Sequence, residues 1–535
     1  MSSLDYAILA VYFVLTIGFG LHYARRWKGT EDFFLAGRSL TWPLIGLSLF
    51  ATNISTEHFV GLAAGGSKEG LVQGGYEWIA SYCLLMLAAV FAPQYLKHRV
   101  FTIPEFFEKR FGIETRLMLT VYFLAMIVLT KTSVALYSGS RVLSDLTGWD
   151  FQTVMWGIAL VTAAYTMAGG LAAVVFTDAL QAVILIGGSV LLTGFAMNEV
   201  GGWSGLNERL AVLGKTDLLS MVHGPESDLP FTGFLLGNFL IGGMFYWCMD
   251  QVNVQRVLGA KNVKEARRGA IFAGFLKILP VFILVLPGVI AAALQLDIRG
   301  ADGQPDYNRT YGVLVRTLLP TGLKGVVLAA LLAALMSSIS SMLNSASTLV
   351  ARDVVARFWP STTSRAQILI GQVALVLVVV GGVFSTPLID HYPHLWGYLQ
   401  EITGYLSVPF AVVGLCGVFL PRVNRQGAMV AVGVGIVVSL FLLADSHTEG
   451  GLAGFLRHPY LNSFLHRSFV CAVITFAALL ATSYFTKPPS GDVLSGTFSF
   501  AWVQGEGETA RDLRNAGFWM AGLFVAVTAL WWMFR

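Results

Sequence analysis

The chain has 535 residues, of which 55% are hydrophobic and 12% are charged, whereas about 25% of the residues in soluble domains are charged. Its formal net charge is only +4, and it has no basic stripe interleaved with aromatic residues, which argues against a nucleic-acid-binding protein. Four cysteines, Cys83, Cys248, Cys416 and Cys471, lie in apolar segments without CxxC spacing. We therefore expect a membrane protein with buried thiols, not a disulfide framework or a zinc site.

Apolar segments recur along the whole chain. We count fourteen that have the length, about 20 residues, needed to cross a bilayer. They predict an all-α polytopic membrane protein with about 14 transmembrane helices. Two of these segments, 152–169 and 171–197, are divided only by the turn Ala168-Gly169-Gly170. Because no glycine-rich loop that would cradle a phosphate occurs, we do not expect an ATP-driven pump.

The flanks of the spans predict their orientation. The N-terminal flank, MSSLDY, has no Lys or Arg and no convincing cleavage site, so the first span, 4–24, should be an uncleaved helix. Loops 25–38, 97–110 and 256–268 lie on one side and are rich in Lys and Arg. The positive-inside rule assigns that side to the cytoplasm. Fourteen crossings then place both termini outside a plasma (inner) membrane.

The most informative segment is SLFATNISTEHFVG, residues 48–61, within the span 42–64. It carries five polar residues in six positions, and polar groups at bilayer depth are expected to face a cavity, an ion or a solute. Small residues beside them, such as Gly61 and Gly65, indicate that the helix opens here. Freed backbone carbonyls could then bind a cation, as in the discontinuous helices of secondary transporters.

Polar residues also interrupt other spans. Tyr76-Glu77-Trp78 lies in the third span, MFYWCMDQVNVQR (244–256) in the seventh, and Lys277 in the eighth. In the ninth span, 322–350, helical spacing places a set of polar residues near one stripe: Ser337, Ser338, Ser341, Asn344 and Ser345. Such a stripe either serves a bound ligand or only holds neighbouring helices together.

Eight segments between about residues 35 and 426 carry a resemblance to a known family. They read FATNISTEHFVGLA (50–63), GGYEW (74–78), TIPEFFEKRFG (102–112), GGLAAVVFTDALQ (169–181), YWCMDQVNVQRVLGAKN (246–262), FLKILPVFILVLPG (275–288), MSSISSMLNSASTL (336–349) and YLQEITGYLSVPF (398–410). In this order they resemble the sodium/solute symporter family and, within it, the sodium/glucose cotransporters.

The resemblance implies a LeuT-type architecture of two inverted repeats of five helices, over 42–197 and 229–419. The remaining parts would be an N-terminal helix and cytoplasmic loop (1–41), an outer loop (198–228) and flanking helices (420–535). Each repeat would begin with an interrupted helix, which here is the second and the seventh span. Substrate would bind at the midplane between the repeats.

The resemblance also implies a sodium site between the first helix of the first repeat and a helix of the second. The ligands would be the backbone carbonyls of Ala51, Ile54 and Ala334 and the hydroxyls of Ser337 and Ser338. Sodium is a hard ion that needs oxygen ligands, which carbonyls and serines supply.

A second sodium ion is implied at Asp178, with the hydroxyls of Ser340 and Ser341. The alternative is that Asp178 is an interfacial carboxylate near the N-terminal end of its helix, where the helix dipole would stabilise it.

The substrate site implied by the resemblance comprises Asn53, His58, Glu77, Tyr246, Trp247, Lys277 and Gln400. A sugar needs hydrogen-bonding side chains and an aromatic face, and Tyr246 would stack beneath the ring as the inner gate. Leu62, Tyr76 and Trp396 would close the outer side.

Other interpretations of these residues stay open. His58 could be a satisfied core histidine, and Glu77 and Lys277 could compensate each other's charge without touching a substrate. Gly243 stands where some bacterial galactose carriers have an asparagine, and His58 where they have a glutamine. The identity of the sugar therefore remains open among galactose, glucose, another hexose and an inositol.

Together these features predict a secondary active transporter that couples inward sodium flow to uptake of a hexose or similar polyol by alternating access. Sodium is the coupling ion, and no cofactor or obligate protein partner is expected. The alternatives are a sodium symporter for a sialic acid, amino acid or nucleobase, and a sodium-conducting sugar sensor. A membrane enzyme is not expected, because it would need a His/Asp or Ser/His constellation at an interface, and we find none there with helical spacing.

Overall fold

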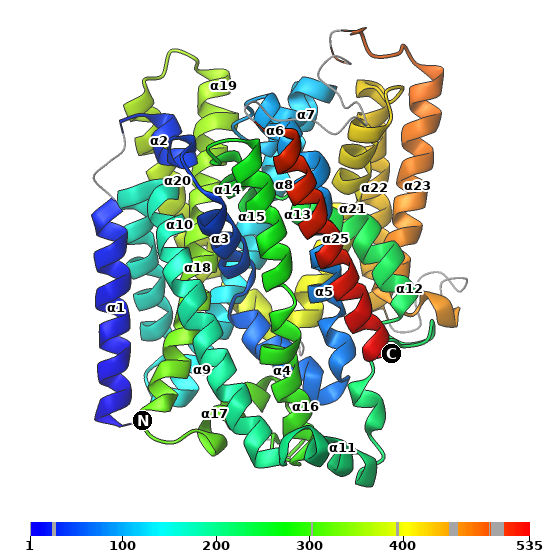
Figure 1. Ribbon diagram of the computed structural model, residues 1–535. Helices are drawn as coiled ribbons and strands as arrows, with labels where there is room; N and C mark the ends of the chain where they lie inside the picture. Colours follow the sequence, from blue (N-terminus) through cyan, green and yellow to red (C-terminus); the bar gives the residue numbers. More distant parts are fainter. Residues whose placement is uncertain are drawn as a thin grey trace.

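The computed structural model describes residues 2–23, 28–300, 303–391, 395–448, 458–491, 493 and 508–535. Long helices stand side by side in one bundle, with short helices at both ends (Figure 1). The bundle contains α1 Ser3–Tyr23, α3 Trp42–Asn53, α4 Thr56–Lys68, α5 Gly75–Met86, α6 Ala92–Lys97, α8 Ile113–Met126, α9 Ser133–Thr147, α10 Phe151–Val200, α13 Met244–Cys248, α14 Gln251–Leu258, α15 Val263–Leu276, α16 Leu286–Ala293, α18 Leu323–Leu349, α20 Ser364–Ser385, α21 Leu395–Phe419, α22 Arg425–His447, α23 Phe464–Phe485 and α25 Ala510–Met533.

Shorter helices and π-helical turns complete the described chain. The short helices are α2 Thr30–Leu35, α7 Ile103–Phe111, α11 Gly202–Val212, α12 Phe231–Gly233, α17 Thr310–Leu318 and α19 Ala356–Phe358. The π-helical turns include η4 Ile127–Thr132, between α8 and α9, and η6 Phe234–Gly243, between α12 and α13. Such turns are often found at functional sites.

Twelve helical segments of the described chain are long and apolar enough to cross a membrane. The pair α3 and α4 is not among them, because the break between the two leaves each half short. Helix α10 is counted once, although its 50 residues contain a kink. The expected membrane-spanning architecture is therefore present, and the exact number of crossings, about 14, stays a prediction.

The kink in α10 lies at the turn that separates the two predicted spans. Gly170 has φ +57° and ψ −151°, a conformation that L side chains rarely adopt. A Cβ atom at this position would lie 2.3 Å from the carbonyl oxygen of Phe33. Glycine is therefore required here for both the backbone turn and the close approach of α2.

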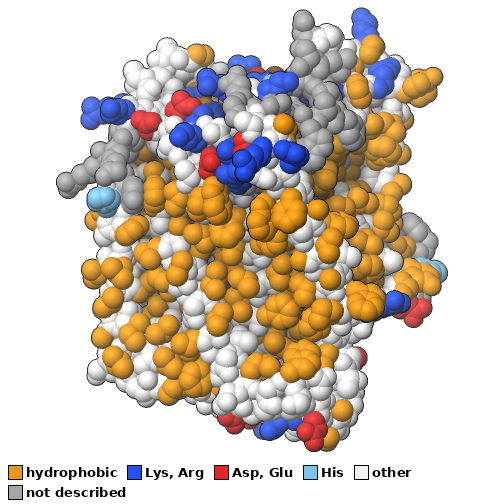
Figure 2. All heavy atoms as spheres, viewed as in Figure 1, with side chains coloured by type: hydrophobic (Ala, Val, Ile, Leu, Met, Phe, Trp, Pro, Cys, Tyr) orange, Lys and Arg blue, Asp and Glu red, His pale blue; other side chains and the backbone are white. Residues whose placement is uncertain are grey.

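Charge is distributed unevenly between the two ends of the bundle. Figure 2 shows a broad hydrophobic band with Lys and Arg side chains gathered above it and a smaller mixed cluster below. The N-terminus and the C-terminus both lie toward the end opposite the main basic cluster (Figure 1). This arrangement is what the positive-inside rule requires if both termini are outside.

Both expected helix interruptions are present. Helix α3 ends at Asn53 because Ile54 and Ser55 are extended, with ψ angles of 107° and −176°. Helix α13 ends at Cys248, and Asp250, with ψ 126°, precedes α14. The Asp250 carboxylate accepts a hydrogen bond from the N–H of Val252 at 2.9 Å, so it caps the second half of the broken helix.

The first helix is fastened to α18, the helix that carries the predicted hydroxyl stripe. Asp5 Oδ1 accepts hydrogen bonds from the N–H groups of Gly322 and Gly325, each at 2.9 Å. The N-terminal N–H groups of a helix have no partner within the helix, so a residue of α1 caps α18. Helix α18 is buried along most of its length, and its position is therefore fixed by its neighbours.

Candidate functional site

The five expected sodium ligands come together where α3 ends beside α18. Ser337 Oγ donates to the carbonyl of Ala51 at 2.9 Å and to that of Ala334 at 3.0 Å. Ser338 Oγ lies 3.5 Å from the carbonyl oxygen of Ile54 and donates to a further carbonyl, that of Thr52, at 3.0 Å.

The break in the first discontinuous helix explains why the carbonyls of Ala51, Thr52 and Ile54 are available. The last carbonyls of an α-helix have no N–H partner within the helix, and α3 ends at Asn53. Serine hydroxyls can donate to the carbonyls or turn a lone pair toward a cation. All of these groups are buried oxygen ligands, the kind that a hard cation prefers. The arrangement therefore fits a sodium ion.

The rest of the hydroxyl stripe has different contacts. Ser345 Oγ donates to Gln255 Oε1 at 2.7 Å, which joins α18 to α14. This contact matches the alternative in which small polar residues hold helices together. Ser337 and Ser338 thus belong to the cluster at the end of α3. Ser345 makes a packing contact nearer the end of the bundle where most Lys and Arg side chains lie.

Asp178, the candidate for a second ion, is fully buried within the helix bundle. Its Oδ2 accepts hydrogen bonds from Ser48 at 2.6 Å, Thr52 at 3.2 Å and Ser341 at 3.4 Å. Arg256 Nη2 lies 3.9 Å from the same oxygen. These partners are side chains of α3, α14 and α18, so three helices meet α10 at this carboxylate.

Two details bear on whether Asp178 binds an ion. Its Oδ1 has no hydrogen-bond partner among the described residues, so one lone-pair face is open to a cation. Ser340, however, donates to the carbonyl of Ser337 at 3.0 Å. Of the two expected hydroxyl ligands, Ser341 and not Ser340 is therefore bonded to Asp178.

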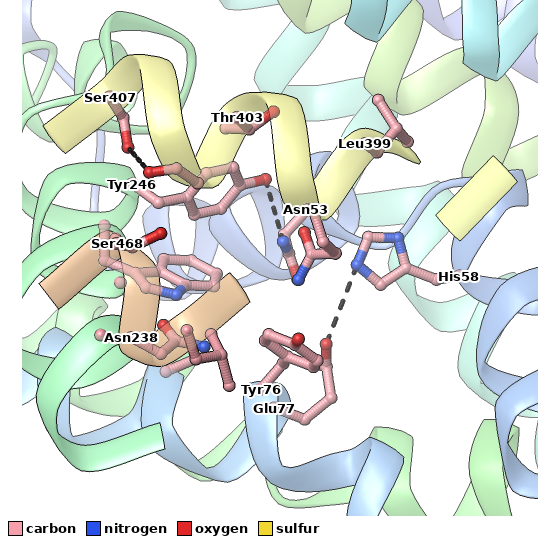
Figure 3. Close-up of a pocket in the computed structure, with 18 of the residues that line it drawn as sticks. Asn53, His58, Tyr76, Glu77, Asn238, Tyr246, Leu399, Thr403, Ser407 and Ser468 are labelled. Carbon is pink, nitrogen blue, oxygen red and sulfur yellow. Dashed lines mark hydrogen bonds and ion pairs between the residues drawn. The ribbon is translucent and has the colours of Figure 1, made fainter. Parts of the chain in front are cut away.

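A cavity in the centre of the bundle brings together six of the seven expected substrate residues (Figure 3). Asn53 and His58 come from the two halves of the first broken helix, Glu77 from α5, Tyr246 and Trp247 from α13, and Gln400 from α21. The seventh, Lys277, is fully buried behind this wall. Its ammonium is 5.4 Å from the centre of the Trp247 ring.

Lys277 is held by an ion pair and an amide. Its ammonium contacts Glu77 Oε2 and Asn53 Oδ1. The expected mutual compensation of Glu77 and Lys277 is therefore present in this structure. Because Glu77 also lines the cavity, this pairing is compatible with a contact between the carboxylate and a solute.

His58 has a structural contact as well as a position in the cavity. The N–H of Ser55 donates to His58 Nδ1 at 3.3 Å, which completes a capping box at the start of α4. On the other side of the ring, Nε2 lies 3.8 Å from Glu77 Oε1. The histidine is thus fixed by the helix break and presents one edge to the carboxylate, as Figure 3 shows.

The expected inner gate is tied to the first broken helix. Asn53 Nδ2 donates to the hydroxyl of Tyr246 at 3.0 Å. Lys131, in η4, lies 2.6 Å from Asp250 Oδ2 and 5.4 Å from the centre of the Tyr246 ring. Tyr246 therefore lies between an amide of α3 and an ion pair at the break of α13 and α14.

The outer side of the cavity is bounded by Tyr76, Gln400 and Phe464, which also line a second cavity beyond it. Leu62 is fully buried and lines neither of these two cavities. The side chain of Trp396 lies outside the described residues, so its expected place in the outer gate stays a prediction.

Several residues of the cavity wall were not among the expected ones. Glu57 and Lys131 add charge, and Asn238, Thr403, Ser407 and Ser468 add uncharged polar groups. Glu57 stands out in the sequence because it lies next to His58 in a membrane span. Ser468 has no such signal, because α23 belongs to the flanking helices and carries few polar residues.

Comparison with known proteins agrees with this arrangement. The family model described as "Sodium:solute symporter family" matches residues 33–435. The chain is 34% identical to sodium/glucose cotransporter 1 of Ovis aries over 528 residues, which cover 91% of this chain and 79% of that protein. It is 35% identical to sodium/myo-inositol cotransporter 2 of Homo sapiens over 527 residues, which cover 92% and 78%.

Solved structures show the same fold. The chain is similar to a sodium-coupled sialic acid symporter in a substrate-bound outward-open state, with a TM-score of 0.78, 22% identity and coverage of 91% of this chain and 99% of that one. It is also similar to the nucleobase-cation symporter Mhp1 in a closed conformation, with a TM-score of 0.56, 16% identity and coverage of 86% and 97%. The expected all-α, LeuT-type fold is confirmed.

Proposed function

Because this chain belongs to the sodium:solute symporter family, we propose that it couples inward sodium flow to the uptake of a hexose or similar polyol. Members of this family are transporters and not enzymes. One observation carries the proposal: the opened end of α3 meets the hydroxyls of Ser337 and Ser338, and its last residue, Asn53, lines the central cavity. Ion and solute would thus bind to the same broken helix.

Sodium would be bound by the carbonyls of Ala51, Ile54 and Ala334 and the hydroxyls of Ser337 and Ser338. No carboxylate takes part, which favours an affinity low enough for release into the cell. One sodium ion moving through 100 mV supplies about 2.3 kcal/mol, and about 1.4 kcal/mol corresponds to a tenfold concentration ratio. A single ion would therefore sustain substantial accumulation of a neutral solute.

A second sodium ion at Asp178 is supported by the open Oδ1 of that carboxylate. The guanidinium of Arg256, 3.9 Å from Oδ2, opposes it, because a cation would have to share the carboxylate with this charge. Ser341 and Thr52 would supply the remaining side-chain oxygens. This site would double the electrical driving force per transport cycle.

The charges of the cavity favour a neutral solute over an anion. Lys277 is paired with Glu77, and Lys131 with Asp250. Glu57 Oε2 is buried and has no hydrogen-bond partner in the described part of the chain. With both lysines paired and an additional carboxylate present, a solute that bears a carboxylate of its own, such as a sialic acid, would be repelled.

The remaining expected substrate residues would act as follows. Asn53, His58, Glu77 and Gln400 would hydrogen-bond hydroxyls, Lys277 would orient Glu77, and Tyr246 and Trp247 would offer an aromatic face. Leu62, Tyr76 and Trp396 would close the outer side, and Tyr246 would move to open the inner side. We place the protein in the plasma (inner) membrane, with both termini outside.

The test is sodium-gradient uptake into proteoliposomes, with labelled glucose, galactose, myo-inositol, a sialic acid and an amino acid in parallel. The proposal requires sodium-driven accumulation of one of the neutral polyols, abolished when an ionophore collapses the gradient. Sodium-driven uptake of only the charged solutes would refute the choice of substrate. Sugar-evoked current without accumulation would instead identify a sodium-conducting sensor.

A further inference from the structure

Glu57 is a carboxylate in the wall of the central cavity that has no ion-pair partner in the described part of the chain. The residue is only 8% exposed, and it lines the cavity. Its Oε2 is buried and has no hydrogen-bond partner among the described residues. Buried carboxylates are normally paired and hydrogen-bonded. Glu57 therefore offers an unmet acceptor to whatever occupies the cavity.

The charged groups in and behind the cavity wall do not balance. Lys277 is paired with Glu77, and Lys131 Nζ lies 2.6 Å from Asp250 Oδ2. These two ion pairs account for both lysines and for two of the three carboxylates. Glu57 is left as a surplus negative charge, and a buried charge without compensation is costly.

Neighbouring ionisable groups leave this count unchanged. His58 Nδ1 accepts a hydrogen bond from the N–H of Ser55. An imidazolium ring has two N–H donors and no acceptor, so His58 is neutral here. Asp178 and Arg256 add one charge of each sign, 3.9 Å apart.

The position of Glu57 in its helix favours the ionised form. The residue lies in the first turn of α4, where the positive end of the helix dipole stabilises a carboxylate. The dipole supplies no hydrogen-bond donor to Oε2. A protonated carboxyl would need an acceptor instead, and Oε2 has no described partner of either kind. A cationic donor is the group that satisfies both the charge and the hydrogen bond.

The geometry separates Glu57 from the expected sodium site. None of the five expected sodium ligands lines the central cavity, whereas Glu57 does. The hydroxyls of Ser337 and Ser338 face carbonyls at the end of α3. A cationic group that enters the cavity with the solute would therefore reach Glu57 without displacing the ion.

We propose that Glu57 binds an ammonium group of the solute, so that the preferred substrate is an amino sugar, a hexose in which a protonated amine replaces one hydroxyl. An ammonium group supplies N–H donors together with a positive charge, whereas a hydroxyl would supply a hydrogen bond alone. An amino sugar has the size of its parent hexose, so the expected sugar residues would contact its remaining hydroxyls. This inference rests on the proposed function and deepens it by naming a substrate class.

The experiment compares neutral sugars with their amino counterparts as competitors of sodium-driven sugar uptake in proteoliposomes. Glucose is compared with a set of amino-deoxyglucoses that carry the amine at different carbons, and galactose with a corresponding set. At least one amino sugar should compete about tenfold more strongly than its neutral parent, as expected for one charged hydrogen bond. The N-acetylated form of that sugar keeps the nitrogen without the charge and should lose the advantage.

The variant Glu57→Gln should remove this preference, because the amide keeps the size of the side chain and loses the charge. Competition by the neutral sugar should change less than twofold. The control is Glu208→Gln, since Glu208 is exposed on α11 and does not line the cavity. It should leave the preference as in the parent protein.

Melting in detergent gives a readout that does not depend on transport. Without solute, Glu57→Gln should melt at a higher temperature than the parent, because the variant removes an uncompensated buried charge. The preferred amino sugar should raise the melting temperature of the parent more than its neutral counterpart does, since a ligand stabilises the state that binds it. In Glu57→Gln the two sugars should have equal effects.

The inference is overturned if no amino sugar competes more strongly than its neutral parent, or if Glu57→Gln keeps the preference. A raised sodium half-saturation in Glu57→Gln with an unaltered sugar preference would overturn it by assigning the carboxylate to sodium. Sodium-driven uptake of a neutral sugar with no advantage for its amino counterparts would refute only this inference. The absence of sodium-driven uptake of any sugar, neutral or amino, would refute the proposed function itself.

Discussion

Lys131 Nζ lies 2.6 Å from Asp250 Oδ2, and this ion pair joins η4, in the first half of the chain, to the break of the second discontinuous helix. The exposed fractions of the two side chains are 12% and 4%. The pair lies beside Tyr246, the expected inner gate. An opening of the inner side that moves α13 away from η4 would have to separate these charges.

Removing one partner of this ion pair should destabilise the protein. Lys131→Met or Asp250→Asn alone leaves a buried charge uncompensated, a change that typically costs about 3–5 kcal/mol. The double variant removes both charges, and Asn at 250 can still accept from the N–H of Val252. We expect a clear loss of thermal stability in each single variant and recovery of most of it in the double variant, measured by melting in detergent. Equal, additive losses would show that the two residues do not interact.

Ser338→Ala should abolish sodium-dependent uptake at physiological sodium while the protein is still made and inserted. Loss of one oxygen ligand to a charged ion costs about 1.5–3 kcal/mol, so the sodium half-saturation should rise roughly tenfold to a hundredfold. The measurement is uptake as a function of sodium concentration. Ser345→Ala is the control on the same helix, because its hydroxyl donates to Gln255. A normal half-saturation in Ser338→Ala would refute the ion site.

Glu77→Ala and Gln400→Ala should weaken sugar binding far more than folding. Gln400 is only half-buried and carries no charge, so its loss leaves no buried charge unpaired. Loss of Glu77 leaves Lys277 without its ion-pair partner. The variant Glu77→Gln keeps the size of the side chain and its hydrogen-bonding oxygen but removes the charge. It therefore separates the effect of the lost charge from that of the lost contact with sugar. Sugar affinity is measured directly by equilibrium binding, and melting provides the stability reference. If both alanine variants bind sugar like the parent protein, the assignment of the pocket is wrong.

Asp178→Asn tests the second ion. If sodium binds Oδ1, the Hill coefficient for sodium should fall from near 2 in the parent to near 1, and the ratio of charge to sugar moved should halve. The amide retains an acceptor for Ser48, Thr52 and Ser341, although the buried Arg256 loses its neighbouring carboxylate. A parent protein that already moves one charge per sugar would rule out this site.

The parts of the structure that could be predicted from the sequence are those where residue chemistry conflicts with the membrane. Asn53 and Glu57 inside an apolar span marked the break between α3 and α4, and Gly170 marked the kink in α10. Polar residues in a membrane span are costly, so they stand out in a single sequence. The resemblance to a known family supplied the pairing of this break with the serines of α18.

Other features depend on packing and could not be predicted in the same way. The cavity wall contributed by Ser468 depends on how α23 packs against η6 and α21, and nothing in its sequence distinguishes it from an ordinary flanking helix. The cap that Asp5 places on α18 joins residues more than 300 positions apart. Similarly, Asn238 reaches the cavity wall from η6, a π-helical segment that nothing in the sequence indicates.

Asn53 has one further consequence. Its amide contacts the ammonium of Lys277 and the hydroxyl of Tyr246, and the next residue, Ile54, contributes a carbonyl to the expected ion cluster. Linkage between two ligands is reciprocal, so if the ion raises the affinity for the sugar by some factor, the sugar raises the affinity for the ion by the same factor. A variant that breaks this link, such as Asn53→Ala, would then bind sodium and sugar independently of each other. It would also carry sodium across the membrane without sugar.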